Sequence, residues 1–222
     1  MKTAPIPKDE EQRLASLHAL RILDTSPEER FERITRLALR VFKVPISTLT
    51  LVDKDREWFK SCQGLPVREG PRAISFCGHA LVERDSLVVP DTLKDERFRD
   101  NPMVIGEPHI RFYAGVPVVG IDGYRLGVFC IKDRTPREFQ EEDRALLKDL
   151  AAWASLELQI TQLQETLLMN EEFRQVVEDE LKESRDVNKL VVGREIKMVE
   201  LKREIVGLQS RLRACEEAQR KG

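Results

Sequence analysis

The feature that most constrains this fold is an apolar repeat that begins near Phe139 and continues almost to the end of the sequence. Apolar side chains recur there at alternating steps of three and four residues, the heptad period of helices that pack along a seam. The seam consists of Trp153, Leu156, Ile160, Leu163, Leu167, Val191, Met198, Leu201, Ile205, Leu208, Leu212 and Cys215. One helix of about 80 residues would extend on the order of 120 Å. No small domain can bury so long a stripe, so the sequence predicts a parallel coiled-coil homodimer.

The centre of this repeat is weaker than its ends. Seam positions are occupied there by Asn170, Arg174, Ser184 and Asn188, and the phase slips by about one residue near Gly193. A helical hairpin that folds back between Ser184 and Gly193 is therefore the alternative to the dimer. We favour the dimer, because strong helix formers dominate this part of the sequence.

Two amphipathic helices are expected near the start of the chain. The first lies between Asp9 and Ile22. The second is expected to begin at Ser26-Pro27-Glu28-Glu29, which combines an N-cap serine, a proline at the first helical position and a glutamate two residues later, the arrangement of a capping box. Pro45 closes this helix. Its predicted buried face consists of Phe31, Ile34, Leu37, Ala38 and Val41.

From Val44 the hydrophobic period changes from helical to strand-like. The expected strands are Ile46 to Asp53, Arg56 to Cys62, Leu87 to Val89, Ile110 to Val119 and Tyr124 to Lys132. Asp53-Lys54-Asp55 and Asp122-Gly123 are polar hairpin turns, so neighbouring strands pair antiparallel. In the second strand, alternation predicts that Trp58 and Cys62 share one face. The fold class is α+β: a five- or six-stranded, mainly antiparallel sheet flanked by helices, followed by a long coiled-coil helix.

The stretch from Ser75 to Asp91 is predicted to form one wall of a ligand cavity. Ser75 is a good N-cap for a short helix that carries Cys77 and His79, and a short strand ends at Pro90-Asp91. The following residues, 93–107, give mostly loop signals. A small helix, a short strand and a loop that lie over a sheet would enclose a small molecule.

Composition excludes several partners. The formal net charge is −2 and the isoelectric point is near 6.1, and charges of both signs are interspersed, so neither nucleic acid nor a membrane surface is an expected partner. No apolar run is as long as a membrane span, and Met1 to Glu10 contains no apolar signal segment. The four cysteines show neither CxxC nor zinc-site spacing, so we expect a reduced, cytoplasmic protein.

The motifs of the globular part together resemble a bacterial GAF domain. They are Ile22-Leu23-Asp24-Thr25, Trp58-Phe59-Lys60, Ser75-Phe76-Cys77-Gly78-His79-Ala80, Val89-Pro90-Asp91, Arg97-Phe98, Asn101-Pro102, Ile110-Arg111-Phe112-Tyr113-Ala114-Gly115-Val116-Pro117 and Leu126-Gly127. The resemblance implies a lead-in helix at residues 1–19, a sensory domain at 20–155 and a coiled coil at 156–222. Val192 to Lys202 resembles the connector helices of sensor kinases. A dimer and a place in signal transduction are therefore implied.

The expected ligand is unknown, but differences from known branches of the family disfavour two ligand classes. Cyclic GMP is disfavoured because Asp95-Glu96 precedes Phe98, the reverse of the order in the branch that binds it. A covalent bilin is disfavoured because Gly78 separates Cys77 from His79. Free methionine sulfoxide reductases share the fold and use cysteines, but Cys62, Cys77 and Cys130 do not match a recognisable cysteine motif of that branch. A kinase output is not expected either, because the coiled coil has no phosphoacceptor histidine and no ATP-binding region follows it.

Eight residues are candidates for lining the cavity, and each also has an ordinary structural interpretation. They are Trp58, Phe76, Cys77, His79, Asp91, Phe98, Arg111 and Tyr113. A thiol near a helix N-terminus can have a lowered pKa and react with oxidants, but a buried cysteine is more often a small core residue. Arg111 and Tyr113 are expected on the same face of a strand, where they could bind an anionic or aromatic ligand. No set of nucleophile, base and orienting group is visible, so we do not expect an enzyme.

Three functions are consistent with the sequence. The first is a sensory module that detects a small ligand or a protein state and transmits it through the dimeric coiled coil to a downstream signalling protein. The second is a dimerisation scaffold without a ligand. The third is a thiol-based redox sensor or reductase that uses Cys77.

Overall fold

Six antiparallel strands form one sheet in the order β3-β2-β1-β6-β5-β4. The structure is a computed structural model that describes the backbone of residues 1–219 and the side chains of 1–185, 194 and 197–207. The strands are β1 Ile46–Val52, β2 Arg56–Gln63, β3 Glu69–Pro71, β4 Leu87–Val89, β5 Phe112–Val119 and β6 Arg125–Asp133. The α+β class with a mainly antiparallel sheet is confirmed. Strand β3 was not predicted, because its three residues lie within the expected loop from Gln63 to Arg72.

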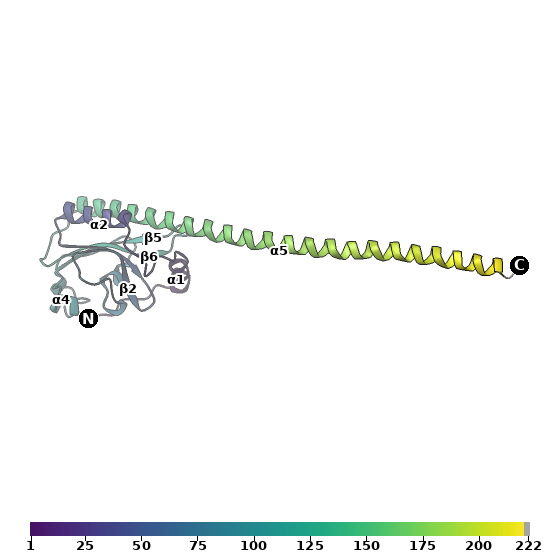
Figure 1. Ribbon diagram of the computed structural model, residues 1–222. Helices are drawn as coiled ribbons and strands as arrows, with labels where there is room; N and C mark the ends of the chain where they lie inside the picture. Colours follow the sequence, from purple (N-terminus) through teal and green to yellow (C-terminus); the bar gives the residue numbers. More distant parts are fainter. Residues whose placement is uncertain (220–222) are drawn as a thin grey trace. The chain divides into compact units, whose positions relative to one another are not determined.

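Helices cover both faces of the sheet (Figure 1). On one face, α1 (Glu10–Ala19), α2 (Glu29–Phe42) and the first turns of α5 (Glu141–Gln219) enclose the larger core. On the other face, α3 (Phe76–Ala80), α4 (Pro102–Ile105) and the short 3₁₀ turns η1 (Arg72–Ile74) and η2 (Thr92–Lys94) surround a smaller core. Strand β6 contributes to both cores: Phe129 and Ile131 belong to the larger, and Val128 and Cys130 to the smaller. Alternation along a strand sends successive side chains to opposite faces.

A β-bulge at Lys60 changes which side chains of β2 share a face. The pairing steps from Leu49 opposite Ser61 to Thr50 opposite Phe59, so Lys60 is an extra residue. Trp58 lies in the larger core, and the Ser61 hydroxyl is 2.7 Å from the hydroxyl of Thr35 in α2. The prediction that Trp58 and Cys62 share a face is therefore wrong, since the extra residue brings Ser61 to the face of Trp58.

Helix α2 begins later than its sequence predicts. Its N-cap is Glu28, whose side chain makes no capping hydrogen bond. The Lys60 side chain is completely buried, and Nζ donates to the Ser26 carbonyl at 3.0 Å, to the Thr25 hydroxyl at 2.7 Å and to Glu28 at 2.5 Å. A buried ammonium group needs such acceptors. The predicted capping box is wrong, because the N-cap is Glu28 rather than Ser26 and the Glu29 carboxylate pairs with Arg36 instead.

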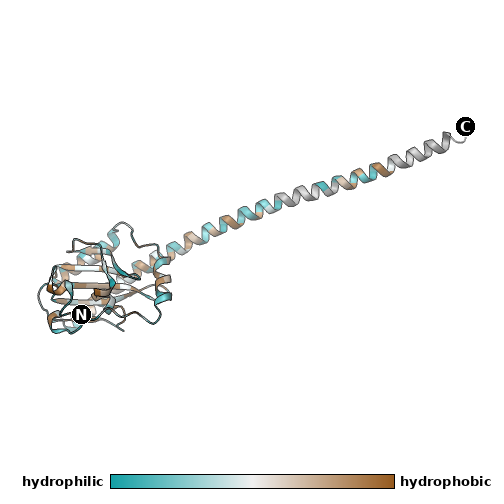
Figure 2. Ribbon diagram, turned by 90° about the horizontal axis from the view of Figure 1, so that it is seen from below, coloured by the Kyte–Doolittle hydropathy of each residue, from teal (hydrophilic) through white to brown (hydrophobic). Residues whose placement is uncertain are grey.

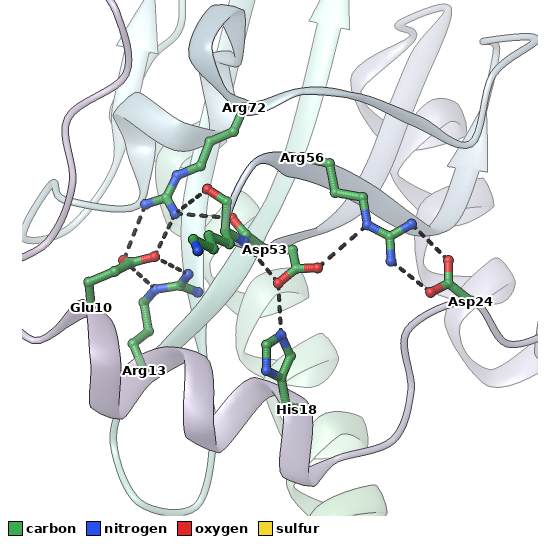
Figure 3. A network of polar contacts seen from close by, with 8 residues as sticks. Glu10, Arg13, His18, Asp24, Asp53, Arg56 and Arg72 are labelled. Carbon is green, nitrogen blue, oxygen red and sulfur yellow. Dashed lines mark hydrogen bonds and ion pairs between the residues drawn. The ribbon is translucent and has the colours of Figure 1, made fainter.

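A network of charged side chains ties α1 to the β1–β2 hairpin and to η1 (Figure 3). Glu10 accepts hydrogen bonds from Arg13 at 2.8 and 2.9 Å and from Arg72 at 2.5 and 3.2 Å. His18 Nε2 lies 2.8 Å from Asp53. Burial alone would raise the pKa of Glu10, but the two guanidinium groups outweigh it and lower the pKa to about 2. The lead-in helix is thereby joined to η1 by the Glu10–Arg72 ion pair and to the β1–β2 hairpin by the contact between His18 and Asp53.

The chain divides into two compact units, Met1–Leu167 and the residues from Leu168 onward. Within the first unit, one face of α5 is buried in the larger core through Leu147, Leu150, Ala151, Ala154 and Leu158. Four apolar residues of its other face are exposed at 37–68% of their area: Leu156, Ile160, Leu163 and Leu167. Figure 2 shows hydrophobic residues recurring along α5. In α2, Leu37 and Val41 are also exposed, at 38% and 42%, so the prediction that they are buried is wrong.

The second unit is helical throughout its described backbone, including the stretch from Ser184 to Gly193 where a hairpin turn was the alternative. Met198, Leu201 and Ile205 are exposed at 44–55%. The side chains of the other predicted seam residues in this unit, Val191, Leu208, Leu212 and Cys215, lie outside the described residues. The coiled coil itself stays a prediction. None of the helices that the structure describes is long and apolar enough to cross a membrane.

Candidate functional site

The predicted wall forms as a short helix that packs its aromatic side chains on the sheet. The Ser75 hydroxyl caps α3 by accepting from the Gly78 amide at 2.9 Å, as expected. The Phe76 ring stacks on Phe98 at 4.3 Å and on Tyr113 at 5.1 Å between centroids. The ring of His79 meets Phe98 edge-on at 4.9 Å. Four rings from α3, β5 and the segment after η2 therefore form one aromatic group.

The N-terminal segment covers α3 from outside. The Ala4 amide donates to the Ala73 carbonyl at 3.2 Å, and His79 Nε2 donates to the Lys2 carbonyl at 3.0 Å. A Cβ atom on Gly78 would come within 2.7 Å of the Ala4 Cβ, so glycine is what allows the segment to cross here. Burial lowers the pKa of His79. This histidine therefore anchors the chain terminus, one of the two interpretations that the sequence left open.

Beneath α3 two cysteine thiols touch. Cys77 Sγ and Cys130 Sγ are 3.6 Å apart, and both residues are fully buried. The Tyr113 hydroxyl donates to Cys77 Sγ at 3.5 Å, and the Thr48 hydroxyl lies 3.1 Å from Cys130 Sγ. A Cβ atom on Gly115 would lie 2.3 Å from the Tyr113 hydroxyl, so a glycine there leaves room for it. The thiols are thus held by hydroxyl groups from two strands, β1 and β5.

Two buried charges adjoin the thiols. Lys132 is 1% exposed, and its Nζ lies 5.4 Å from the centroid of the Phe59 ring. Glu57 is 2% exposed and accepts a hydrogen bond from the Ser75 hydroxyl. Buried charges are costly unless they interact with one another or with polar groups. We call Cys77, Cys130, Tyr113, Lys132 and Glu57 the thiol–lysine cluster.

The pKa values of the two thiols in the cluster are shifted in opposite directions. Burial raises the pKa of Cys77 well above its usual value, and the neighbouring Cys130 raises it further. Burial opposes ionisation of Cys130 as well, but hydrogen bonding from Cys77 and the positive charge of Lys132 lower its pKa to about 6. Burial would lower the pKa of Lys132, yet the negative charge on Cys130 raises it. The sequence favoured Cys77 as a small buried core residue over a thiol with a lowered pKa, and its burial and raised pKa agree with that interpretation; the lowered pKa belongs to Cys130.

Five of the eight predicted site residues come together and three do not. Phe76, Cys77, His79, Phe98 and Tyr113 all lie on the α3 side of the sheet. Trp58 packs in the larger core on the opposite face of the sheet, so the prediction that it lines the cavity is wrong. The Arg111 guanidinium pairs with the Asp91 carboxylate at 2.9 Å, so these two candidates bind each other. Arg111 lies before the first residue of β5, and the prediction that it shares a strand face with Tyr113 is therefore wrong.

Four residues of the site were missed by the sequence analysis: Glu57, Phe59, Cys130 and Lys132. A usable signal existed in β6, where Lys132 is in phase with Val128 and Cys130 in an otherwise apolar strand. A charge at a predicted core position of a central strand indicates a buried polar partner. That partner could not be named in advance, because Cys77 and Cys130 are brought together only by the packing of α3 on the sheet.

The comparison with protein-family models completes this evidence. The model of the GAF domain matches residues 26–158, which is more than half of the chain. The chain belongs to the GAF domain family. The resemblance inferred from the sequence motifs is thereby confirmed, and GAF domains are signalling and sensory modules.

A curated relative and several solved structures resemble this GAF domain. The chain is 42% identical over 152 residues to a protein named cyclic di-GMP phosphodiesterase PA2567 from Pseudomonas aeruginosa; the match covers 68% of this chain and 26% of that protein. This chain thus matches only about a quarter of the relative's length.

Among solved structures, the GAF domain of a phosphoenolpyruvate-protein phosphotransferase from Coxiella burnetii has a TM-score of 0.54 at 15% identity, covering 70% of this chain and 98% of that one. A free methionine-R-sulfoxide reductase from Neisseria meningitidis, solved with its substrate, has a TM-score of 0.51 at 18% identity, with coverages of 74% and 99%. At these identities the likeness shows the fold alone.

Proposed function

We propose that this GAF domain is a regulatory module in bacterial cyclic di-GMP signalling, which senses a small ligand or a protein state. In this proposal, α5 pairs in parallel with α5 of a second copy and transmits the sensed state to a downstream signalling protein. The observation that carries the proposal is the 42% identity over 152 residues to a protein named as a cyclic di-GMP phosphodiesterase.

Strand β6 offers a physical route from the site to α5. Cys130 and Lys132 lie on the face of the thiol–lysine cluster, whereas Phe129 and Ile131 pack in the core that also contains Leu147 of α5. Close packing transmits small displacements across a sheet. A ligand that prefers one position of β6 would therefore favour one packing of α5, and hence one arrangement of the dimer.

An exchange experiment tests the role in cyclic di-GMP signalling. The segment of the Pseudomonas phosphodiesterase that aligns with this chain is replaced by the corresponding segment of this chain, and hydrolysis of cyclic di-GMP is measured. We expect a rate within a few-fold of the parent enzyme. The matched control carries the Coxiella GAF domain, which shares the fold at 15% identity and should lose regulated activity. Equal rates in the two chimaeras, or none in the first, would contradict the proposal.

One observation favours the second candidate, a dimerisation scaffold without a ligand. Phe76, Cys77 and Tyr113 are at most 1% exposed, so the protein's own side chains fill the space beneath α3. A surface hollow of about 360 Å³ lies elsewhere, between Pro7, Arg13, Leu81 and Arg125.

Native mass spectrometry of the purified chain, followed by thermal unfolding with a panel of metabolites, separates the two candidates. A bound compound, or a concentration-dependent rise in melting temperature, supports the sensory module. The absence of both supports the scaffold.

A further inference from the structure

The two touching thiols of the thiol–lysine cluster belong to elements far apart in the sequence. Cys77 is the second residue of α3, the short helix of the wall, and Cys130 is in the central strand β6. Their sulfur atoms are 3.6 Å apart, so a disulfide of about 2.05 Å requires them to approach by about 1.5 Å. Side-chain rotation together with a small shift of the five-residue helix can supply such a movement. Cys62 differs, because its Sγ faces the Leu65 and Val67 carbonyls.

The surroundings of the pair supply one nucleophile and one proton donor. The ammonium group of Lys132 and the hydroxyl of Thr48 stabilise a thiolate on Cys130. Cys77 keeps its proton, since it is buried beside that negative charge. The thiolate is the form that attacks an oxidant, and a neighbouring thiol is the group that resolves the product.

We propose that Cys77 and Cys130 are a modification site at which hydrogen peroxide forms an intramolecular disulfide. The Cys130 thiolate attacks one peroxide oxygen, the O–O bond breaks, and hydroxide leaves and is protonated to water. Cys130 is then a sulfenic acid. The Cys77 sulfur attacks the Cys130 sulfur, the S–O bond breaks, and the departing hydroxide takes the Cys77 proton as a second water. Two thiols are oxidised by two electrons in total, and one peroxide is reduced to two waters.

Peroxide reaches the pair through local opening of α3. This helix has only five residues and is held by its Ser75 cap and by the N-terminal segment, and such short elements open at low free-energy cost. The disulfide would bind α3 to β6 and remove the thiolate that Lys132 faces. The inference is independent of the proposed role in cyclic di-GMP signalling, because it rests only on the chemistry of the two thiols.

The test uses the full chain with the substitution Cys215→Ser, because the Cys215 side chain lies outside the described residues and could link two copies. The protein is exposed to graded hydrogen peroxide, quenched with catalase, denatured in acid, alkylated with N-ethylmaleimide and mapped by mass spectrometry. We expect Cys77 and Cys130 to lose the maleimide label together, and a linked peptide to appear that is lighter by two hydrogens. Dithiothreitol should restore both labels, and Cys62 should keep its label.

Two variants serve as controls. Cys62→Ser should form the same link at an unchanged rate, and Cys130→Ala should leave Cys77 fully labelled. The mapping of the two native cysteines does not depend on either variant folding. Three outcomes would overturn the proposal. They are a disulfide that includes Cys62, oxidation of Cys130 to sulfinic acid without a disulfide, and full labelling of Cys77 and Cys130 at peroxide levels that oxidise Cys62.

Discussion

Two buried lysines illustrate how the same residue type has different roles in this GAF domain. Lys60 Nζ is saturated by three acceptors from the connector before α2 and is structural. Lys132 Nζ lies over the ring of Phe59, and its positive charge acts on the neighbouring Cys130 thiol. A buried charge that several acceptors bind holds a fold together, whereas a buried charge beside titratable groups shifts their pKa values and is typical of functional sites.

The charge of Glu10 gives a prediction at this scale. Its pKa is lowered from 4.5 to about 2, so its ionised form stabilises the fold fully above pH 4.5, less as the pH falls toward 2, and not below. Glu10→Gln should reduce the free energy of unfolding at pH 7 by about 1–2 kcal/mol, allowing for partial exposure. Urea unfolding at several pH values measures this. The deficit should shrink between pH 4.5 and 2, and Glu11→Gln, at an exposed site, should show almost none. A deficit that is constant with pH would contradict the assignment.

At the scale of elements, the sheet depends on close backbone approach where β1 meets β6. A Cβ atom on Gly127 would lie 1.9 Å from the Thr50 carbonyl oxygen and 2.9 Å from the Leu51 Cα. Both are backbone atoms of a central strand and cannot move aside without breaking the ladder. The β6 strand, which carries Cys130 and Lys132, is thereby fixed against β1.

Gly127→Ala should therefore reduce the free energy of unfolding by about 3 kcal/mol or more. Gly70→Ala is the matched control in the same sheet, because its Cβ atom would meet nothing closer than 3.6 Å. It should cost less than about 1 kcal/mol. Urea denaturation of both variants measures the difference, and equal stabilities would show that the two strands are further apart than the structure has them.

At the scale of the whole molecule, the described part of α5 carries a stripe of exposed apolar side chains. Leu156, Ile160, Leu163 and Leu167 are exposed in the first unit, and Met198, Leu201 and Ile205 in the second. Exposed apolar residues at heptad spacing are typical of helices that pair with another helix. The predicted parallel homodimer would cover them.

We expect light scattering coupled to gel filtration to give the mass of a dimer for the full chain. The double substitution Leu156→Glu and Leu163→Glu should convert it to a monomer, because two charges would be buried in each copy of the seam. Ile121→Glu is the control, since Ile121 is equally exposed, at 54%, but lies in the β5–β6 turn. A native chain that is monomeric at every concentration would contradict the predicted dimer.

The order of helices and strands could be predicted from the sequence alone because it depends on local patterns. Strand periodicity, the Asp122-Gly123 turn and the Ser75 cap are each set by neighbouring residues, and the structure confirms the sheet and the capped helix. The resemblance of the motifs to GAF domains was confirmed for the same reason.

Tertiary structure alone decided which side chains meet. A single bulge at Lys60 changed which residues of β2 share a face, and the buried Lys60 ammonium group binds the connector before α2. The contact between Cys77 and Cys130 joins residues 53 positions apart along the chain. Local patterns contain no information on such distant contacts, since register, bulges and charge pairing are fixed only when the elements pack. The sequence therefore determined the elements and the family, and packing determined the chemistry of the site.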